Sequence, residues 1–299
     1  AAESILLALD DADLSMGDME AFYCGNIKEV NRMVGQKTLQ LIGQTGIPIV
    51  NCTNACATGA TAFREGWMSI KAGMHDVVLV SGVEKMGTGL LGGDTGELGI
   101  PLEGLIGSQT MPAIFSEAGM EHARNHGTSF EQFAKISVKN HHHSTMNPKS
   151  RYQIETPLNE VMESEMIAYP NTKLMCSANV DGSAAAAVVS EKKAKELGMA
   201  RAIKVKASIL TSDPYDDRNL VMPNINTLTV NAAKQAYEMA SLGPDDLDLV
   251  ELHDCFASAE MLHYGNLGLC MNEDAGRYVD EGRFQIGGKL PVNLSGGLL

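Results

Sequence analysis

Short apolar runs alternate with helical patterns in the first third of this sequence. Such runs, bounded by Gly, Pro or Asn, are typical of buried strands, and helices between them are typical of a parallel sheet covered on both faces. The predicted strands are Met19–Cys24, Ile47–Asn51 and His75–Gly82, and the predicted helices are 1–11, Gln36–Ile42 and a stretch from Cys56 to Ile70. The sequence therefore predicts an α/β protein.

The last third of the chain repeats the order of the first. Ala240–Leu252 has the same succession of helix end, acidic turn and apolar strand as Ala12–Phe22, and Lys289–Asn293 resembles Ile47–Asn51. Two matches in the same order predict two similar βαβ halves, which is an internal duplication at the scale of a domain. The helix and strand that follow in the first half are absent after Asn293, so we expect the C-terminal half to be incomplete.

The alternation stops within the N-terminal half, from about Glu84 to Pro170. A glycine-rich stretch, Gly87–Gly107, is followed by two predicted helices, Met111–His126 and Ser129–His143. Strands are predicted again at Ser183–Ser190 and Ala202–Leu210. We therefore expect a loop domain over 84–170, inserted into an N-terminal half that covers 1–83 and 171–195, and a C-terminal half over 196–299.

Composition excludes several classes of protein. The 299 residues carry a formal net charge of −14, which argues against nucleic acid as the main partner because phosphate binding favours a basic surface. No run approaches the roughly 20 apolar residues that span a bilayer. Six cysteines in a chain of this length do not indicate a disulfide scaffold, so we expect free or catalytic thiols and a cytoplasmic location.

Cys56 stands where a predicted buried strand meets a predicted helix. Backbone N–H groups and the helix dipole favour negative charge at that end of a helix, and the small neighbours Ala55, Ala57 and Gly59 leave room for a substrate. These conditions suit a cysteine nucleophile that attacks a carbonyl carbon. The alternative is a small core cysteine at a tight turn.

A second junction of strand and helix carries His253, Asp254 and Cys255. Ligand sites in α/β sheets gather at the carboxyl ends of strands. The pattern indicates an imidazole and a thiol at such an end, one cysteine in each half of the chain. The alternative is a helix-capping aspartate between two core residues.

Taken together, these residues resemble the thiolase superfamily, and most closely the sterol-carrier-protein type of thiolase. The most specific block is Glu251–Phe256, because other thiolases have Asn-Glu-Ala-Phe at its end. The remaining matching segments are Asn54–Gly59, Val80–Met86, Ser137–His141, Met175–Ser177, Asp181–Ala185 and Gly287–Gly297. The resemblance covers nearly the whole chain and implies the thiolase fold, layered αβαβα, and a place in fatty-acid and lipid metabolism.

The resemblance also implies a reaction, the reversible Claisen condensation of coenzyme A thioesters. Cys56 would take the acyl group, and Cys255 would move the α-proton of acetyl-CoA. His253 would hold the oxygen of the enolate-like intermediate, where one preorganised donor is worth about 3–4 kcal/mol. Asp254 would steer the hydrogen bonds around His253 without contacting the substrate itself. No cofactor is implied, since the coenzyme A thioesters are substrates.

In the family a Gly-His-Pro turn follows the Ser-Gly-Gly segment, and its histidine activates the nucleophilic cysteine. This chain ends at Leu299 before such a turn, and its start lacks the first strand of the family. We therefore expect a chain truncated at both ends. Asn293-Leu-Ser also differs from the usual Asn-Pro-Ser.

Several weaker candidates accompany these residues. By resemblance, His141, Ser295 and Gly296 are expected near the bound substrate. We expect no metal site, because the consecutive histidines 141–143 cannot all face one ion and the pair His122 and His126 has no evident third ligand. Four cations are candidates for contacts with coenzyme A phosphates: Lys85, Arg124, Lys135 and Lys139. Cys176 is expected to be structural.

Three functions therefore remain open. The first is an acyl-CoA thiolase that uses Cys56 and Cys255. The second is a thiolase-fold aldolase that cleaves a β-hydroxyacyl-CoA without a covalent intermediate, together with a partner protein that carries a zinc ribbon and an OB-fold. The third is a non-catalytic subunit. The resemblance further implies a homodimer or tetramer.

Overall fold

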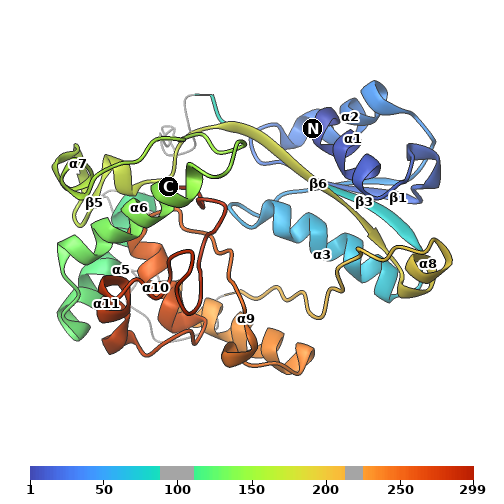
Figure 1. The fold of residues 1–299 in the computed structure, drawn as a ribbon. Coiled ribbons are helices and arrows are strands. Elements are labelled where there is room, and N and C mark those ends of the chain that lie inside the picture. The colour runs from blue at the N-terminus through green and yellow to red at the C-terminus, as the bar shows by residue number, and fades with distance from the viewer. Residues whose placement is uncertain (88–110, 213–224) are drawn as a thin grey trace. The chain divides into compact units, whose positions relative to one another are not determined.

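A computed structural model describes residues 1–87, 111–212 and 225–299 (Figure 1). The chain divides into two compact units. One consists of Ala1–Gly89 with Asn179–Leu210, and the other of Leu90–Ala178 with Thr211–Leu299. The glycine-rich stretch expected over 87–107 lies almost entirely outside the described residues. The four-part domain division expected from the sequence stays a prediction.

The first unit is built on a four-stranded sheet in the order β2-β1-β3-β6. Its strands are β1 (Ala21–Gly25), β2 (Ile49–Cys52), β3 (Val77–Lys85) and β6 (Asp181–Val189). β1 is parallel to β2 and to β3, as predicted, but β6 is antiparallel to β3 along its whole length. The expectation of an all-parallel sheet is therefore wrong at β6. The chain between β3 and β6 passes through the second unit, so no single crossover helix imposes a parallel return.

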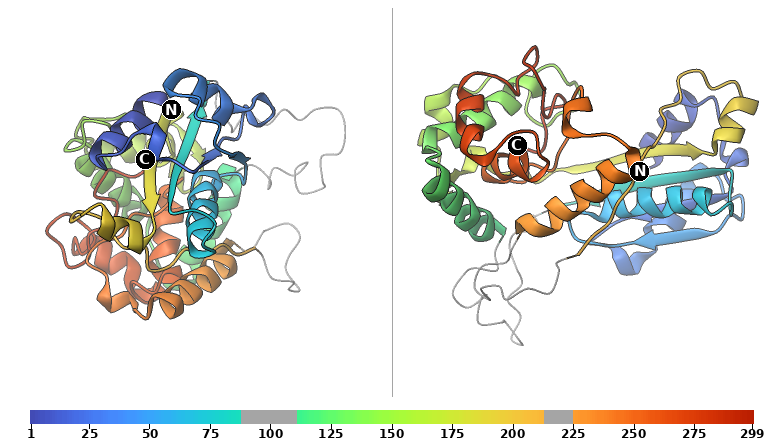
Figure 2. Two further views of the ribbon diagram at one scale, coloured as in Figure 1. Left: turned by 90° about the vertical axis from the view of Figure 1, so that its right-hand side faces the viewer. Right: turned by 90° about the horizontal axis from the view of Figure 1, so that it is seen from below.

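Helices cover both faces of this sheet. α1 (Ala2–Asp11) and α2 (Val34–Ile42) lie on one side, and α3 (Thr58–Lys71) lies on the other, as Figures 1 and 2 show. The strands alternate accordingly: Phe22 and Leu79 join the core under α1 and α2, whereas Tyr23 and Val80 join the core under α3. A short helix, α8 (Glu191–Glu196), follows β6.

The second unit is mainly helical. It contains α5 (Met111–His126), α6 (Phe130–Ser144), α7 (Leu158–Glu163), α9 (Ile225–Ala240), α10 (Ala257–Asn266) and α11 (Asn272–Asp280), with a two-stranded hairpin of β4 (Met166–Ala168) and β5 (Asn171–Thr172). α10 packs against α5, α6 and α11, and the rings of Tyr264 and Phe284 stack with centroids 3.8 Å apart. The helices of the expected loop domain thus share one hydrophobic core with the C-terminal helices.

The repeat found in the sequence is visible in the backbone of each unit. α1 and α9 are each followed by a residue with positive φ, Asp13 at 54° and Ser241 at 55°. A 3₁₀ helix follows three residues later in both cases, Met16–Asp18 and Pro244–Asp246, and its last aspartate accepts a hydrogen bond from the backbone N–H three residues before it. The two segments therefore have the same local fold.

The strands expected in the C-terminal half are reduced or absent. Val250 and Val292 form a single parallel bridge, the counterpart of the pairing between β1 and β2. Ala202–Leu210 forms no strand, so that prediction is wrong. Ile203 is 90% exposed, and apolar β-branched residues alone do not make a strand where no neighbouring strand supplies hydrogen bonds. Among the described residues, no helix has both the length and the apolar character that crossing a bilayer requires.

Candidate active site

Cys56 lies in the first unit, in the turn between β2 and α3. The Thr58 hydroxyl accepts a hydrogen bond from the Asn54 backbone N–H at 2.7 Å and donates one to the Ala55 carbonyl at 2.7 Å. The Asn54 amide also donates to the Thr61 hydroxyl at 3.0 Å. The turn is therefore held in one shape at the N-terminus of a 14-residue helix, as predicted, and the Cys56 residue is exposed and forms no disulfide.

Hydrogen bonds fix the ends of β1 and β3 next to this turn. The Asn26 N–H donates to the Cys52 carbonyl at 3.1 Å, and its side-chain amide donates to the Val83 carbonyl at 2.8 Å. Glu84 accepts from the Ile27 N–H at 2.8 Å. These bonds anchor the loop after β1 at the carboxyl end of the sheet, which is the end at which Cys56 stands.

His253, Asp254 and Cys255 lie in the second unit, between the bridge at Val250 and the start of α10. The Leu252 N–H donates to the side chain of Asn293 at 2.9 Å. The Cys255 carbonyl accepts from the Ser177 N–H at 3.0 Å. The segment is thus held on one side by the Asn293 side chain and on the other by the Ser177 backbone. The Cys255 residue is half-buried and outside any disulfide.

Asp254 points into the protein. Its carboxylate accepts from the side-chain amide of Asn140 at 2.8 Å and from the Leu298 N–H at 2.8 Å. Burial, followed by the negative charge of Glu260, raises the pKa of Asp254 to about 8. Because its oxygens bind α6 and the C-terminal segment, Asp254 ties three parts of the second unit together at the candidate site.

The surroundings of His253 favour its neutral form. Although the residue as a whole is exposed, desolvation of its imidazole ring lowers the pKa of that ring. His263, on α10, is partly buried, and desolvation together with the proximity of His253 lowers its pKa to about 4. A neutral imidazole carries one N–H donor and one acceptor nitrogen, so in this form His253 can donate one hydrogen bond and accept another.

Gly296 and Ser295 belong to a tight turn after Asn293. Gly296 has φ of +100°, and a Cβ there would lie 2.6 Å from the Cβ of Ser144 at the end of α6. The N–H and hydroxyl of Ser295 donate to the carboxylate of Glu251 at 2.9 and 2.7 Å. The turn is therefore packed against the C-terminal end of α6, the helix that also contains His141.

The three histidines of α6 have separate roles in the fold. His141 is buried beside Tyr152 and bonded to the Thr156 hydroxyl at 2.7 Å. His142 is exposed and pairs with Glu155 at 2.6 Å, whereas His143 is buried and contacts the Asn293 carbonyl at 2.9 Å. The three side chains therefore have different partners.

The other sequence candidates are also placed. The rings of His122 and His126 lie 4.8 Å apart, and His122 bonds to the Thr128 hydroxyl at 3.0 Å. No cluster of three or more metal-ligating side chains occurs within the described ranges. Burial raises the pKa of Cys176 to about 12, and its thiol donates to the Thr172 carbonyl, which fits a structural cysteine.

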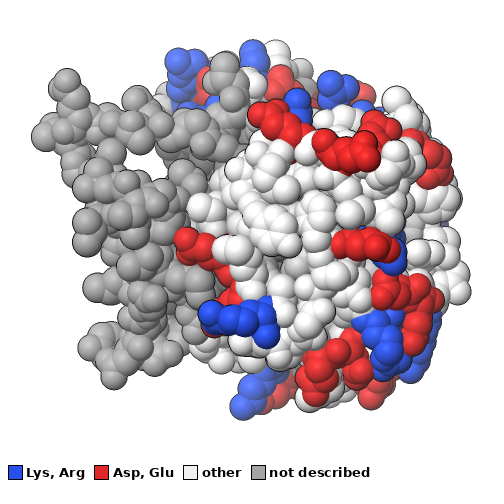
Figure 3. All heavy atoms as spheres, turned by 90° about the vertical axis from the view of Figure 1, so that its left-hand side faces the viewer, with Lys and Arg blue, Asp and Glu red and all other residues white. Residues whose placement is uncertain are grey.

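One proposed phosphate contact is wrong. Lys139 is buried and forms an ion pair with Glu260 at 2.7 Å, so it cannot reach a solvent-borne phosphate. Lys135 is held by Glu131 and Asp280, at 2.8 and 2.7 Å. On the face in Figure 3, charged side chains of both signs surround a broad uncharged area.

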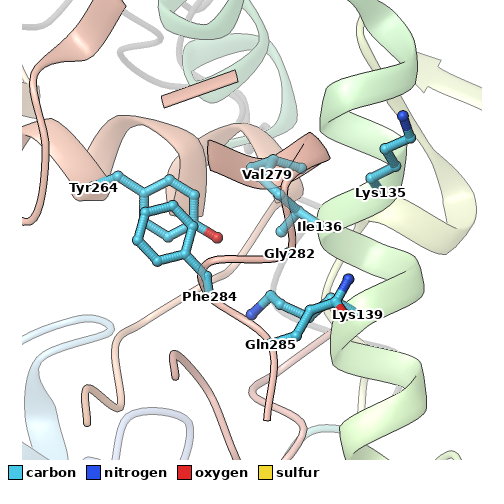
Figure 4. A pocket seen from close by; sticks show the side chains of 8 residues that line it. All are labelled: Lys135, Ile136, Lys139, Tyr264, Val279, Gly282, Phe284 and Gln285. Atoms are coloured by element: carbon cyan, nitrogen blue, oxygen red, sulfur yellow. The ribbon is translucent and has the colours of Figure 1, made fainter. Parts of the chain in front are cut away.

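The buried pair of Lys139 and Glu260 is the feature that sequence reasoning missed. The sequence contained one indication of it: apart from His263, Glu260 is the only charged residue in helix α10. Figure 4 shows Lys135, Ile136 and Lys139 on α6 opposite the stacked rings of Tyr264 and Phe284. The space enclosed there is about 10 Å³, enough for about one water molecule and too small for a substrate.

Cys56 and the His253–Cys255 segment thus stand in different units. The second unit brings His253, Asp254 and Cys255 together with the turn at Ser295 and Gly296 around the end of α6. The convergence of Cys56 on that group stays a prediction.

Comparison with known proteins identifies the family. A family model described as the N-terminal domain of thiolase matches residues 1–166, and one described as thiolase C-terminal domain-like matches residues 219–299. A solved structure described as an Ltp2-ChsH2(DUF35) aldolase superposes with a TM-score of 0.78 over 99% of this chain and 78% of that one, at 21% identity. That likeness shows the fold.

Curated relatives support the same assignment. Sterol carrier protein 2 of Oryctolagus cuniculus is 37% identical over 98% of this chain and 56% of its own length. An acetyl-CoA acetyltransferase of Methanothermobacter thermautotrophicus is 34% identical over 99% of this chain and 78% of its own length. The chain spans about half the length of the sterol carrier proteins it matches. With both family models and these relatives in agreement, the chain belongs to the thiolase family.

Proposed function

We propose that this protein is an acyl-CoA thiolase, an acetyl-CoA C-acyltransferase that forms an acyl-cysteine at Cys56. The observation that carries the proposal is the exposed Cys56 in a fixed turn at the N-terminus of α3, in a chain of the thiolase family. A relative named acetyl-CoA acetyltransferase supports the same activity. Coenzyme A thioesters are the proposed substrates, without a further cofactor.

In the direction of cleavage, the Cys56 thiolate attacks the 3-keto carbonyl of a 3-ketoacyl-CoA. The bond between Cα and the keto carbon breaks, and its electron pair passes to acetyl-CoA as an enolate. Cys255 protonates that carbanion, while His253 donates a hydrogen bond to the enolate oxygen. Coenzyme A, whose thiol proton passes to solvent, then attacks the acyl-cysteine and releases Cys56 as the thiolate, while the Cys255 thiolate regains a proton from solvent. Condensation is the reverse.

Intact-mass spectrometry tests the covalent step. After incubation with acetyl-CoA, the wild-type chain is expected to gain one acetyl group, mapped by peptide analysis to Cys56. Cys56→Ser is expected to lose this product, and Cys176→Ser, a change at a buried thiol, is expected to keep it. An unmodified wild-type protein would contradict the proposal.

The second candidate is a thiolase-like aldolase acting on a β-hydroxyacyl-CoA with a partner protein. It is favoured by the structural likeness to a protein described as an aldolase with a DUF35 component. Retro-aldol cleavage needs no acyl-enzyme, so release of acetyl-CoA from a β-hydroxyacyl-CoA without acylation of Cys56 would select it. If neither reaction occurs, the remaining candidate is a non-catalytic subunit. A relative from Thauera aromatica is itself named as a subunit, benzoylsuccinyl-CoA thiolase subunit BbsB.

The assembly is proposed by the same resemblance. We expect a homodimer or tetramer, and a zinc-ribbon and OB-fold protein as partner if the aldolase activity is found. A cytoplasmic location is proposed from the free thiols. Light scattering of the purified protein measures the oligomeric state directly.

A further inference from the structure

A charged pair lies in the core of the second unit. Lys139 Nζ and a Glu260 oxygen are 2.7 Å apart, with side chains that are 5% and 0% exposed. The same ammonium group donates to the Val292 carbonyl at 2.8 Å, and Glu260 also accepts from the hydroxyl of Tyr264. Removing two charges from water is costly, and apolar residues of similar volume often serve stability as well. Stability alone therefore does not explain why these two core residues are charged.

Asn140 connects this pair to the candidate site. Its side-chain nitrogen lies 2.7 Å from a Glu260 oxygen and 2.8 Å from an Asp254 oxygen. A primary amide has two N–H donors, so one can serve each carboxylate. Asn140 is fully buried, and it spans from α6 to α10 and to the residue between His253 and Cys255.

Asp254 is bound from the opposite side as well. The Leu298 N–H donates to its second oxygen at 2.8 Å. A Cβ on Gly297 would lie 2.2 Å from Asp254, so only glycine allows this approach. Hydrogen bonds therefore hold the Asp254 side chain between Asn140 and the C-terminal segment. Because His253 and Cys255 are the neighbours of Asp254 in the chain, fixing Asp254 also fixes the backbone that carries their side chains.

We propose that Asn140 is a positioning residue for His253 and Cys255, which it holds by joining Asp254 to the Lys139–Glu260 pair. Asn140 touches no reacting atom. Lys139 neutralises Glu260 and so gives Asn140 a fixed anionic partner in the core. The positioning role of Asn140 rests on the proposed function, in which Cys255 transfers the α-proton of acetyl-CoA. Displacement of Asn140 would then impair the proton-transfer step and leave acylation of Cys56, in the other unit, unchanged.

The test compares the two cysteines within one protein. The rate of iodoacetamide modification is measured for Cys255 and for Cys56 by peptide mass spectrometry between pH 6 and 9, in the wild type and in Asn140→Leu. The leucine has a similar size but cannot donate to either carboxylate. We expect the Cys255 rate to change at least fivefold and the Cys56 rate to stay within twofold. Glu131→Gln, which weakens the surface ion pair with Lys135 on the same helix, is the matched control and is expected to change neither rate.

A second readout reports the chemical step. Exchange of the α-protons of acetyl-CoA with deuterated water is expected to fall at least tenfold in Asn140→Leu, whereas acetyl transfer to Cys56 is retained. If Asn140→Leu does not fold, Asn140→Ala, which removes both donors without adding bulk or charge, replaces it in both measurements.

The outcomes separate this inference from the proposed function. A folded Asn140 variant in which Cys255 reacts as in the wild type, across the whole pH range, overturns the positioning role. A wild-type protein that neither acetylates Cys56 nor exchanges α-protons overturns the thiolase reaction, while the alkylation of Cys255 still decides the role of Asn140.

Discussion

The ammonium group of Lys139 and the carboxylate of Glu260 lie 2.7 Å apart, with both side chains buried in the core of the second unit. Removal of one member of such a pair leaves an uncompensated buried charge, which costs about 3–5 kcal/mol. Lys139→Met is therefore expected to lower the free energy of unfolding by that amount. Urea unfolding followed by far-ultraviolet circular dichroism measures it, since the single tryptophan, Trp67, lies in the first unit.

The double variant Lys139→Met with Glu260→Gln is the control for that prediction. It removes both charges and preserves the approximate volumes, so most of the lost stability is expected to return. A single variant as stable as the wild type would show that Glu260 is not ionised in the fold.

Asp254 makes stability depend on pH. Its pKa is raised from the ordinary 3.8 to about 8, so the folded protein binds a proton that the unfolded chain releases. The contribution is fully present below about pH 4 and is lost as pH rises toward 8, with a slope of at most about 1.4 kcal/mol per pH unit. Asp254→Asn removes this dependence. The difference in unfolding free energy between variant and wild type is expected to shift in favour of the variant between pH 5 and pH 7.5, and an unchanged difference would refute the raised pKa.

Gly297 and Gly287 both have positive φ, 65° and 86°. Alanine at either position incurs the strain of a left-handed conformation, about 1–2 kcal/mol. At Gly297 the new Cβ would also lie 2.2 Å from Asp254, whereas nothing lies within 4 Å at Gly287. We expect Gly297→Ala to be clearly less stable than Gly287→Ala in thermal unfolding. Equal melting temperatures would mean that the Asp254 contact is not made.

The thiols are expected to differ in reactivity. Burial raises the pKa of Cys24 and Cys270 to about 11 and that of Cys176 to about 12, and thiols react as thiolates. Cys56 is exposed. Brief treatment with iodoacetamide at pH 8 is expected to label Cys56 well before these three in the native protein. In urea the difference is expected to disappear; if Cys176 is labelled first, its assignment as structural is wrong.

Local sequence pattern was enough to predict several elements of the fold. Apolar periodicity and turn residues predict the helices at 1–11 and 111–126 and the strand at His75–Gly82, and the structure has α1, α5 and β3 at those places. The repeat of Ala12–Phe22 in Ala240–Leu252 was also visible, since both copies use the same turn chemistry. The turn at Cys56 was also predicted from local pattern, because a buried strand meets a helix there.

Three features became visible only in the folded chain: the direction of β6, the loss of a strand at Ala202–Leu210, and the burial of Lys139. Each depends on which segment lies alongside, and contacts between residues far apart in the chain leave no periodic trace in the sequence. Lys139 and Glu260 are 121 positions apart, and neither pattern alone indicates that one neutralises the other. A lysine has the same charge and length in every context, so its surroundings alone decide whether it meets a phosphate in water or a carboxylate in the core.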